Sequence, residues 1–355
     1  MKKILYFIVF IIIIGICSIL YYNHLLSAPN NDGSEVSIYL DEGSTYSTIG
    51  SILKEKGIIR NELAYKIYVK LNETKDLEYG GYNIKNNLSV KEVIKVLEQG
   101  SNATAETVTL TFYEGKNMRN YVKKISENFN IDEKEIYNKL KDNSYLDTLI
   151  EKYWFLTKDI KNKNIYYSLE GYLFPDTYEF YKSASFEDVI EKMLDNTEKK
   201  LDSYMESVDN SEYSIHQIMT LASIVELEAG TSNDRSGVAG VFYNRLSDGW
   251  ALGSDVTTYY QEKIDNYSRD LTNAELSKCG SYNTRNGCLE GKLPVGPICN
   301  PSLESIVSAI NPKKHNYYYF VADKNGKTYF NKTYSEHTNT VSKLKREGLW
   351  IEYED

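Results

Sequence analysis

Two carboxylates, Glu226 and Glu228, lie within the apolar stretch LASIVELEAG at residues 221–230. Ser214 is a good N-cap, and a helix is expected from there to Ala229. Most sides of this helix are apolar, which predicts burial of both acids on apolar rows. Burial disfavours the charged form of a carboxyl group and raises its pKa, so either acid could act as a general acid near neutral pH.

The spacing of the two acids does not choose between them. Glutamate is common in helices, so a solvated or ion-paired role for either acid is the alternative to catalysis. Arg235 and Arg245 are the candidate ion-pair partners.

Further polar groups follow the acids along the chain. They are Asn244 and Arg245 at the end of a predicted helix, Asp255 in LGSDVTTYY, and Tyr282, Asn283 and Thr284 in GSYNTRNG. Amides, hydroxyls and rings of this kind suit a sugar polymer, which presents hydroxyl edges and flat apolar faces.

The composition limits the classes of function. With 355 residues, 41% of them apolar and 13% aromatic, the chain is long enough for two or three domains with packed cores. A net charge of -9, with lysines interleaved among acids, argues against nucleic acid as a partner. The histidines and cysteines form no CxxC or HExxH pattern, so no metal or other cofactor is expected.

The N-terminus predicts a membrane anchor. Residues 4–22 are uncharged and follow Lys2 and Lys3. About 20 helical residues cross a hydrocarbon layer of about 30 Å. The LLSAP that follows is a poor cleavage site, so an uncleaved single-pass anchor is favoured over a signal peptide. The lysines place a tail of residues 1–3 in the cytoplasm and everything after the anchor outside it.

The elements after a polar linker at residues 23–34 predict an α+β fold. First come a strand in VSIYL, helices at 44–56 and in ELAYKIYVKL, a strand in YGGYNI, and a helix in VKEVIKVLEQ: the order is βααβ, then a helix. Later helices are expected at 119–129, 133–142, 186–207, 214–229 and 237–246. A loop-rich region then extends to 302. Asn325-Gly326 marks the turn of a hairpin that joins YYYFVAD to TYFN.

Two smaller features leave alternatives open. The segments VSIYLDEGSTYSTI and VTLTFYEGKNMRNY carry Glu-Gly pairs, at Glu42 and Glu114, which either record a duplication or reflect two unrelated turns. Three cysteines lie beyond the anchor, so at least one thiol is unpaired within the chain. A local bridge between Cys279 and Cys288 is conceivable.

Taken in order, the segments resemble the MltG (YceG-like) family, the membrane-anchored endolytic murein transglycosylases. The matching segments are LEGYLFPDTYEF, LASIVELEAG, DRSGVAGVFYNRL, LGSDVTTYY, YNT, KLPVGPICNPSLESIVSAINP and YYYFVAD. The resemblance implies a LysM-like module at 35–106 and a YceG-like catalytic domain at 107–355. Val256 stands where the family usually has proline, and Arg285 where it has an aromatic residue.

By this resemblance Glu226, the first acid after SIV, is the catalytic residue. The implied reaction cleaves the β-1,4 bond from N-acetylmuramic acid to N-acetylglucosamine within glycan strands and leaves 1,6-anhydro ends. The substrate-binding candidates are Glu228, Glu170, Asn244, Arg245, Asp255, Tyr282, Asn283 and Thr284.

The implied partners are peptidoglycan glycan strands and wall-synthesis enzymes. Two other readings of the sequence stay open. A muramidase-type hydrolase would leave reducing ends in place of anhydro ends, and a non-catalytic scaffold would bind the cell wall without cutting it.

Overall fold

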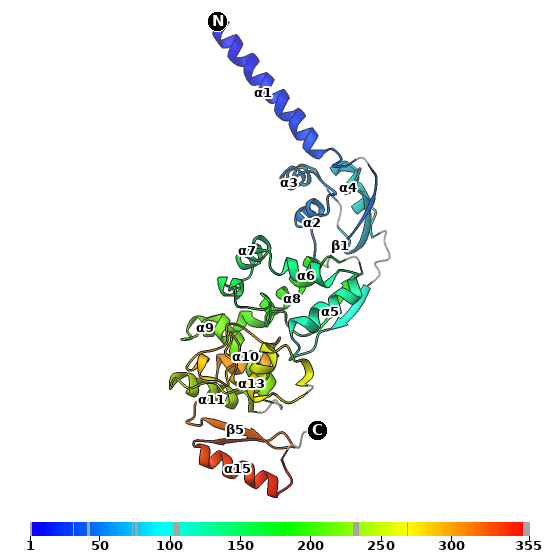
Figure 1. Cartoon of the computed structure of the whole chain (residues 1–355). Coiled ribbons are helices and arrows are strands. Elements are labelled where there is room, and N and C mark those ends of the chain that lie inside the picture. Colours follow the sequence, from blue (N-terminus) through cyan, green and yellow to red (C-terminus); the bar gives the residue numbers. More distant parts are fainter. Residues whose placement is uncertain are drawn as a thin grey trace. The chain divides into compact units, whose positions relative to one another are not determined.

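The computed structural model describes the chain except residues 1, 31, 41–42, 73, 75–76, 102–106, 183, 230–233, 268 and 351–355 (Figure 1). The chain divides into two compact units. The first comprises Met1–Val108 with Tyr181–Ser183, and the second comprises Thr109–Phe180 with Ala184–Asp355. The elements form a mixed α+β fold, as the sequence predicts.

The first unit begins with a helix that is long and apolar enough to cross a membrane. Helix α1 is Lys2–Leu26, and its segment Val9–Leu26 has the length and hydropathy of a membrane span. It runs four residues past the expected end at residue 22, so the linker is shorter than predicted. Leu26 packs against the core of the first unit.

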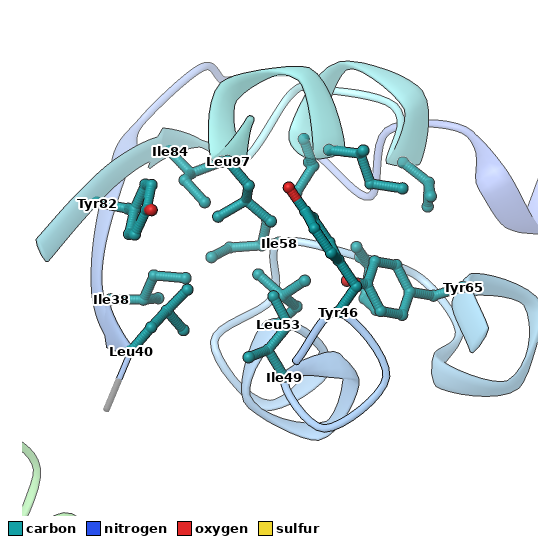
Figure 2. Packing of buried hydrophobic residues seen from close by; sticks show 14 residues of the cluster. Ile38, Leu40, Tyr46, Ile49, Leu53, Ile58, Tyr65, Tyr82, Ile84 and Leu97 are labelled. Atoms are coloured by element: carbon teal, nitrogen blue, oxygen red, sulfur yellow. The ribbon is translucent and has the colours of Figure 1, made fainter. Parts of the chain in front are cut away.

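The expected βααβ order with a following helix is confirmed. The elements are β1 Glu35–Leu40, α2 Gly50–Glu55, α3 Glu62–Leu71, β2 Gly80–Lys85 and α4 Val90–Leu97. The strands β1 and β2 are antiparallel, with Glu35 opposite Lys85 and Leu40 opposite Gly80. Apolar side chains from both strands and all three helices fill one core (Figure 2), including Ile38, Leu53, Tyr65, Ile84 and Leu97.

Helix α2 is shorter than predicted, because the chain forms turns before it. The Thr45 amide donates to the Thr48 hydroxyl at 2.9 Å, and the Thr48 amide donates to the Thr45 hydroxyl at 3.2 Å. Such local bonds compete with helix formation. The helix predicted at 44–56 therefore begins later, at Gly50. Glu42, part of the Glu-Gly comparison, lies outside the described residues.

The second unit is mostly helical. Its elements are β3 Thr107–Thr111, α5 Met118–Phe129, α6 Glu133–Lys139, α7 Asn143–Lys152, β4 Thr177–Tyr181, α8 Phe186–Leu201, α9 Met205–Asp209, α10 Ile215–Glu228, α11 Arg235–Ser247, α12 Asp255–Gln261, α13 Asn273–Ser277, α14 Leu303–Ile310, β5 Tyr319–Ala322, β6 Thr328–Asn331 and α15 Tyr334–Arg346. The first two residues of β3 and the last residue of β4 belong to the first unit. The buried helix α10 packs on α11 and α14.

Capping and turn signals in the sequence correctly predicted α10 and the late hairpin. Ser214 caps α10 by accepting from the Gln217 amide, and the Gln217 side chain completes a capping box. The predicted hairpin is also observed, with β5 antiparallel to β6 and Gly326 in its turn at φ +79°. Helix α8 ends at Leu201 instead of continuing to 207, because a 3₁₀ turn at Asp202–Tyr204 follows it.

Helices α7, α12, α13, α14 and α15 were not predicted. The sequence of α12, DVTTYYQ, is rich in β-branched and aromatic residues, which are weak helix formers. Tertiary contacts compensate for that weakness. The hydroxyls of Thr257 and Thr284 share a hydrogen bond of 2.9 Å, and the Thr258 hydroxyl donates to Asn283 Oδ1 at 2.8 Å.

Cys279 and Cys288 form a disulfide. Cys299 is a buried free thiol that donates to the Ser223 carbonyl at 3.3 Å, and Cys17 is exposed.

The disulfide closes a short loop, and the chain-entropy relation gives it a stabilising effect of about 2 to 3 kcal/mol. We expect the double variant Cys279→Ser/Cys288→Ser to lose about that much free energy of unfolding in urea. Cys17→Ser, which removes an exposed free cysteine, is the control and should leave stability unchanged. Equal stability of the double variant and the wild type would contradict the expectation.

Candidate active site

A cleft of about 450 Å³ opens in the second unit around the end of α10. Three segments form its walls: the loop after β3 with the start of α5, the last turn of α10, and α12 with the turn that follows it. The lining residues are Glu114, Gly115, Lys116, Asn117, Arg119, Asn120, Glu226, Leu227, Val256, Tyr259, Tyr260, Ile264, Asp265, Tyr267 and Ile298.

Glu226 faces this cleft, and its side chain is only 7% exposed. Its Oε2 accepts three hydrogen bonds: from the Ser302 amide at 2.9 Å, the Ser302 hydroxyl at 2.5 Å and the Ser305 hydroxyl at 2.7 Å. Ser302 is the N-cap of α14, where the helix dipole favours negative charge. The carboxyl group is therefore solvated by a helix N-terminus in place of water.

Arg235, the first residue of α11, completes this arrangement. Its guanidinium donates to Glu226 Oε1 at 3.2 Å and to the Ser305 hydroxyl at 2.9 Å, and it pairs with Glu304 at 3.3 Å. Arg235 is one of the two ion-pair partners predicted from the sequence, and it forms an ion pair with Glu226.

The prediction that Glu226 has a raised pKa is wrong. Burial by itself does raise it, but the hydroxyls of Ser302 and Ser305, the Ser302 amide and the Arg235 charge outweigh that effect. The result is a pKa below the ordinary value of 4.5. An apolar helix pattern shows that a carboxyl group is buried, but it does not show which donors other segments bring to it.

Glu228 points away from Glu226 and is not among the residues that line the cleft. Residues two apart on a helix lie about 200° apart around its axis, so the two acids have different surroundings. Glu228 Oε1 accepts from the Ser254 hydroxyl at 2.6 Å. Burial, together with the nearby charge of Asp255, raises its pKa despite this bond.

Glu170 lies behind the cleft wall and is 1% exposed. It accepts from the Met118 amide at 2.8 Å, at the start of α5, and from the Tyr260 hydroxyl at 2.9 Å. Tyr260 lines the cleft, so Glu170 positions two parts of its wall. Burial raises the pKa of Glu170 to about 7, although those bonds and the Arg119 charge favour the carboxylate.

Asn244 and Arg245, two of the predicted substrate-binding residues, bind backbone carbonyls of the protein instead. Asn244 donates to the carbonyls of His315 and Tyr317, and Arg245 donates to those of Tyr318 and Leu252. None of these side chains lines the cleft.

The YNT segment is likewise internal to the protein. Tyr282, Asn283 and Thr284 are fully buried and bonded to protein groups. Asp255 is exposed at the start of α12 and pairs with Arg285 at 3.0 Å. The arginine that departs from the family pattern thus holds the adjoining helix. Val256, the other departure, lines the cleft.

Glu114 is a second cleft carboxylate that the sequence did not single out. Its pKa is raised by burial and by the charge of Glu226, and Arg235 partly opposes this. Gly115 has φ +70°, and a Cβ there would lie 3.3 Å from Leu227 Cδ2. Its amide donates to the Asn300 carbonyl, and the Asn300 amide donates to the Lys116 carbonyl, each at 2.9 Å. The Glu-Gly pair after the strand was the available signal.

An ion pair joins the start of α5 to the turn that follows α12. Arg119 donates to both carboxylate oxygens of Asp265, at 2.5 and 3.1 Å, and the Asn117 amide group donates to Asp265 at 2.7 Å. The rings of Tyr259, Tyr260 and Tyr267 line the cleft nearby. Together with Glu226, the cleft offers proton transfer beside aromatic faces that suit sugar rings.

Comparison with known proteins gives consistent matches. The YceG-like family matches residues 38–343. An endolytic murein transglycosylase of Bacillus subtilis (strain 168) is 33% identical over 327 residues, which cover 91% of this chain and 89% of that protein. One of Streptococcus pneumoniae serotype 2 (strain D39 / NCTC 7466) is 29% identical over 333 residues, which cover 90% of this chain and 60% of that protein.

A solved structure is also similar. The crystal structure of a putative yceG-like protein from Listeria monocytogenes superposes with a TM-score of 0.60 at 30% identity, covering 87% of this chain and 100% of that chain.

The lowered pKa of Glu226 predicts how stability depends on pH. The carboxylate stabilises the fold above its ordinary pKa of 4.5, and that contribution is lost as the pH falls through the folded-state value. Glu226→Gln should therefore lower the free energy of unfolding by about 1 to 3 kcal/mol at neutral pH, because an amide places an NH₂ group against other donors. The deficit should shrink below pH 4.5, as measured by urea unfolding. A deficit independent of pH would contradict this.

Glu170 predicts the opposite sign. Its pKa is raised in the folded state, so the wild type should lose stability as the pH rises from 4.5 to about 7. The loss amounts to about 3 kcal/mol at 1.36 kcal/mol per pKa unit. Glu170→Gln removes this titration, so its stability relative to the wild type should improve over the same interval. A constant difference between the two proteins would refute the assignment.

Proposed function

The chain belongs to the YceG-like family, and from that premise we propose that it is an endolytic peptidoglycan lytic transglycosylase, a lyase that cuts glycan strands of the cell wall. Two relatives at 29 and 33% identity carry the name endolytic murein transglycosylase. The observation that carries the proposal is the placement of Glu226 in a cleft that is also lined by the aromatic rings of Tyr259, Tyr260 and Tyr267.

The proposed bond is the β-1,4 linkage from N-acetylmuramic acid to N-acetylglucosamine. Glu226 donates its proton to the glycosidic oxygen as an oxocarbenium-like centre develops. The resulting carboxylate then removes the proton of the muramic C6 hydroxyl, whose oxygen attacks the anomeric carbon. The bond to the leaving sugar is replaced by an internal ether, giving a 1,6-anhydro end without the addition of water.

The hydrogen bonds to Glu226 support this cycle. Ser302, Ser305 and Arg235 stabilise the carboxylate, so they stabilise the state in which Glu226 has given up its proton. They make Glu226 a strong acid, and the fraction that carries a proton becomes the limiting quantity. A bound sugar that excludes water would raise that fraction. The serine hydroxyls can rotate and accept a bond from the protonated form.

The other parts of the chain have proposed roles that follow from the family. Residues 4–22 anchor the protein in the cell membrane with residues 1–3 in the cytoplasm, residues 35–106 form a LysM-like module, and residues 107–355 form the catalytic domain outside. A short tether confines the enzyme to glycan near the membrane, where new strands emerge. The expected partners are nascent glycan strands and the enzymes that synthesise them.

One observation favours a muramidase-type hydrolase as a second candidate. Hydrolysis generally uses a second carboxylate, to activate water or to act as nucleophile, and Glu114 lies in the same cleft as Glu226. The products distinguish the two reactions, because only hydrolysis leaves a reducing muramic end.

Product analysis by mass spectrometry tests the function and the choice of acid. The wild type should convert glycan strands to fragments with 1,6-anhydro ends, and Glu226→Gln should lower the rate at least 10²-fold, since general acid–base catalysis typically contributes 10²- to 10⁴-fold. Glu228→Gln is the matched variant on the same helix and should retain cleavage. Reducing ends would establish hydrolysis, and an active Glu226→Gln variant would remove Glu226 from the mechanism.

The pH dependence of kcat/KM tests the role of the serines. Because the general acid must be protonated, the rate should fall as the pH rises above the pKa of Glu226 in the free enzyme. Ser305→Ala removes one donor to the carboxylate, so the pKa and the falling limb should move up by about one pH unit.

Ser302→Ala should move the limb in the same direction but also removes the cap of α14. Ser185→Ala, which removes the cap of α8, controls for the loss of a cap alone. An unmoved limb in both site variants would show that these hydroxyls do not set the acid strength.

A further inference from the structure

Helix α3 carries a row of exposed apolar side chains. Leu63, Ile67 and Leu71 are four residues apart, which places them on one side of the helix, and they are 68%, 40% and 74% exposed. The buried side of the same helix carries Ala64 and Tyr65, which are 2% and 0% exposed. The core of the first unit therefore covers one apolar side of α3 and leaves the other uncovered.

The uncovered row belongs to a helix that is fastened to the end of α1. The Tyr22 hydroxyl of α1 donates to the Ala64 carbonyl of α3 at 3.4 Å. Arg60, two residues before α3, donates through Nε to the Ser27 hydroxyl at 3.2 Å. Leu26 packs into the core that α3 covers. These contacts fix α3 beside the last turn of α1.

The length of α1 sets the height of α3 above the hydrocarbon. The uncharged run begins at Ile4, and a hydrocarbon layer of about 30 Å takes up about 20 residues at 1.5 Å each. The layer therefore ends near Asn23, next to the tyrosine that contacts α3. Tyrosines are enriched at this level of a membrane, and Tyr21 and Tyr22 both lie there. The contact places α3 at the boundary of hydrocarbon and headgroups.

The charges on α3 suit the same location. Lys66 and Lys70 are exposed on the helix that carries the apolar row. Lys66 pairs with Glu62 at 2.6 Å, and Lys70 is in the last turn. Long lysine side chains can lie along a lipid surface with their charged ends among the headgroups.

We propose that the face formed by Leu63, Ile67 and Leu71 inserts into the outer surface of the lipid bilayer as a second membrane contact beside α1. The proposal rests on the membrane anchoring in the proposed function. This face contacts phospholipid at the level where acyl chains meet headgroups. With two contacts the first unit cannot turn freely about the end of α1, so one of its sides faces the membrane.

The test uses the full-length protein in phosphatidylcholine vesicles that contain a lipid with a photoreactive diazirine in its acyl chain. After irradiation, adducts are mapped by proteolysis and mass spectrometry. We expect adducts on α1 and on residues 62–71, and at least a tenfold lower yield on α4. Adducts on α1 alone would overturn the proposal while leaving the anchor intact, and no adducts on α1 would refute the anchor itself.

A pair of variants tests whether the lipid adducts on α3 depend on its apolar row. Leu63→Ser/Ile67→Ser/Leu71→Ser changes only exposed side chains and should remove the α3 adducts while those on α1 persist. Lys91→Ser/Lys95→Ser on α4 is the control and should change neither yield. Labelling of α3 only when phosphatidylglycerol is added would assign the contact to charge and overturn the proposal. Cross-linking of α3 between two copies, without lipid adducts, would assign the face to a second copy.

Discussion

One buried carboxylate organises the centre of the second unit. Glu226 lies in the last turn of α10, its donors come from the first turn of α14, and its counter-ion begins α11. These three helices pack on one another, and the acid lies where their ends meet. The ion pair of Glu226 with Arg235 is buried, and removal of one partner would leave the other charge without compensation. The packing of the helices and the ionisation of Glu226 therefore support each other.

Three glutamates around the cleft have different acidities because they have different neighbours. Glu226 is surrounded by donors and a cation, and its pKa is lowered. Glu170 is fully buried and has a pKa of about 7, while the pKa of Glu114 is raised by burial and by the charge of Glu226. Residue type and burial do not fix the proton affinity. The direction depends on whether hydrogen bonds compensate for the lost water.

The sequence predicted the elements that local signals specify. Ser214 and apolar periodicity located α10, and Asn-Gly located the late hairpin. It missed α12, whose threonines and tyrosines become helical through bonds to residues far along the chain. It also misjudged the acidity of Glu226, because Ser302 and Ser305 lie 76 and 79 residues away. The choice of Glu226 over Glu228 came from the order of motifs, since spacing alone treats them alike.

The hydroxyl of Ser302 has two duties. It caps α14, accepting from the Ser305 amide at 3.3 Å, and it donates its own proton to Glu226. A change in the charge of Glu226 is thus transmitted to the first turn of α14, and fraying of that turn would alter the strength of the acid. A substitution at Ser302 would therefore change the stability of the first turn of α14 and the acidity of Glu226 together.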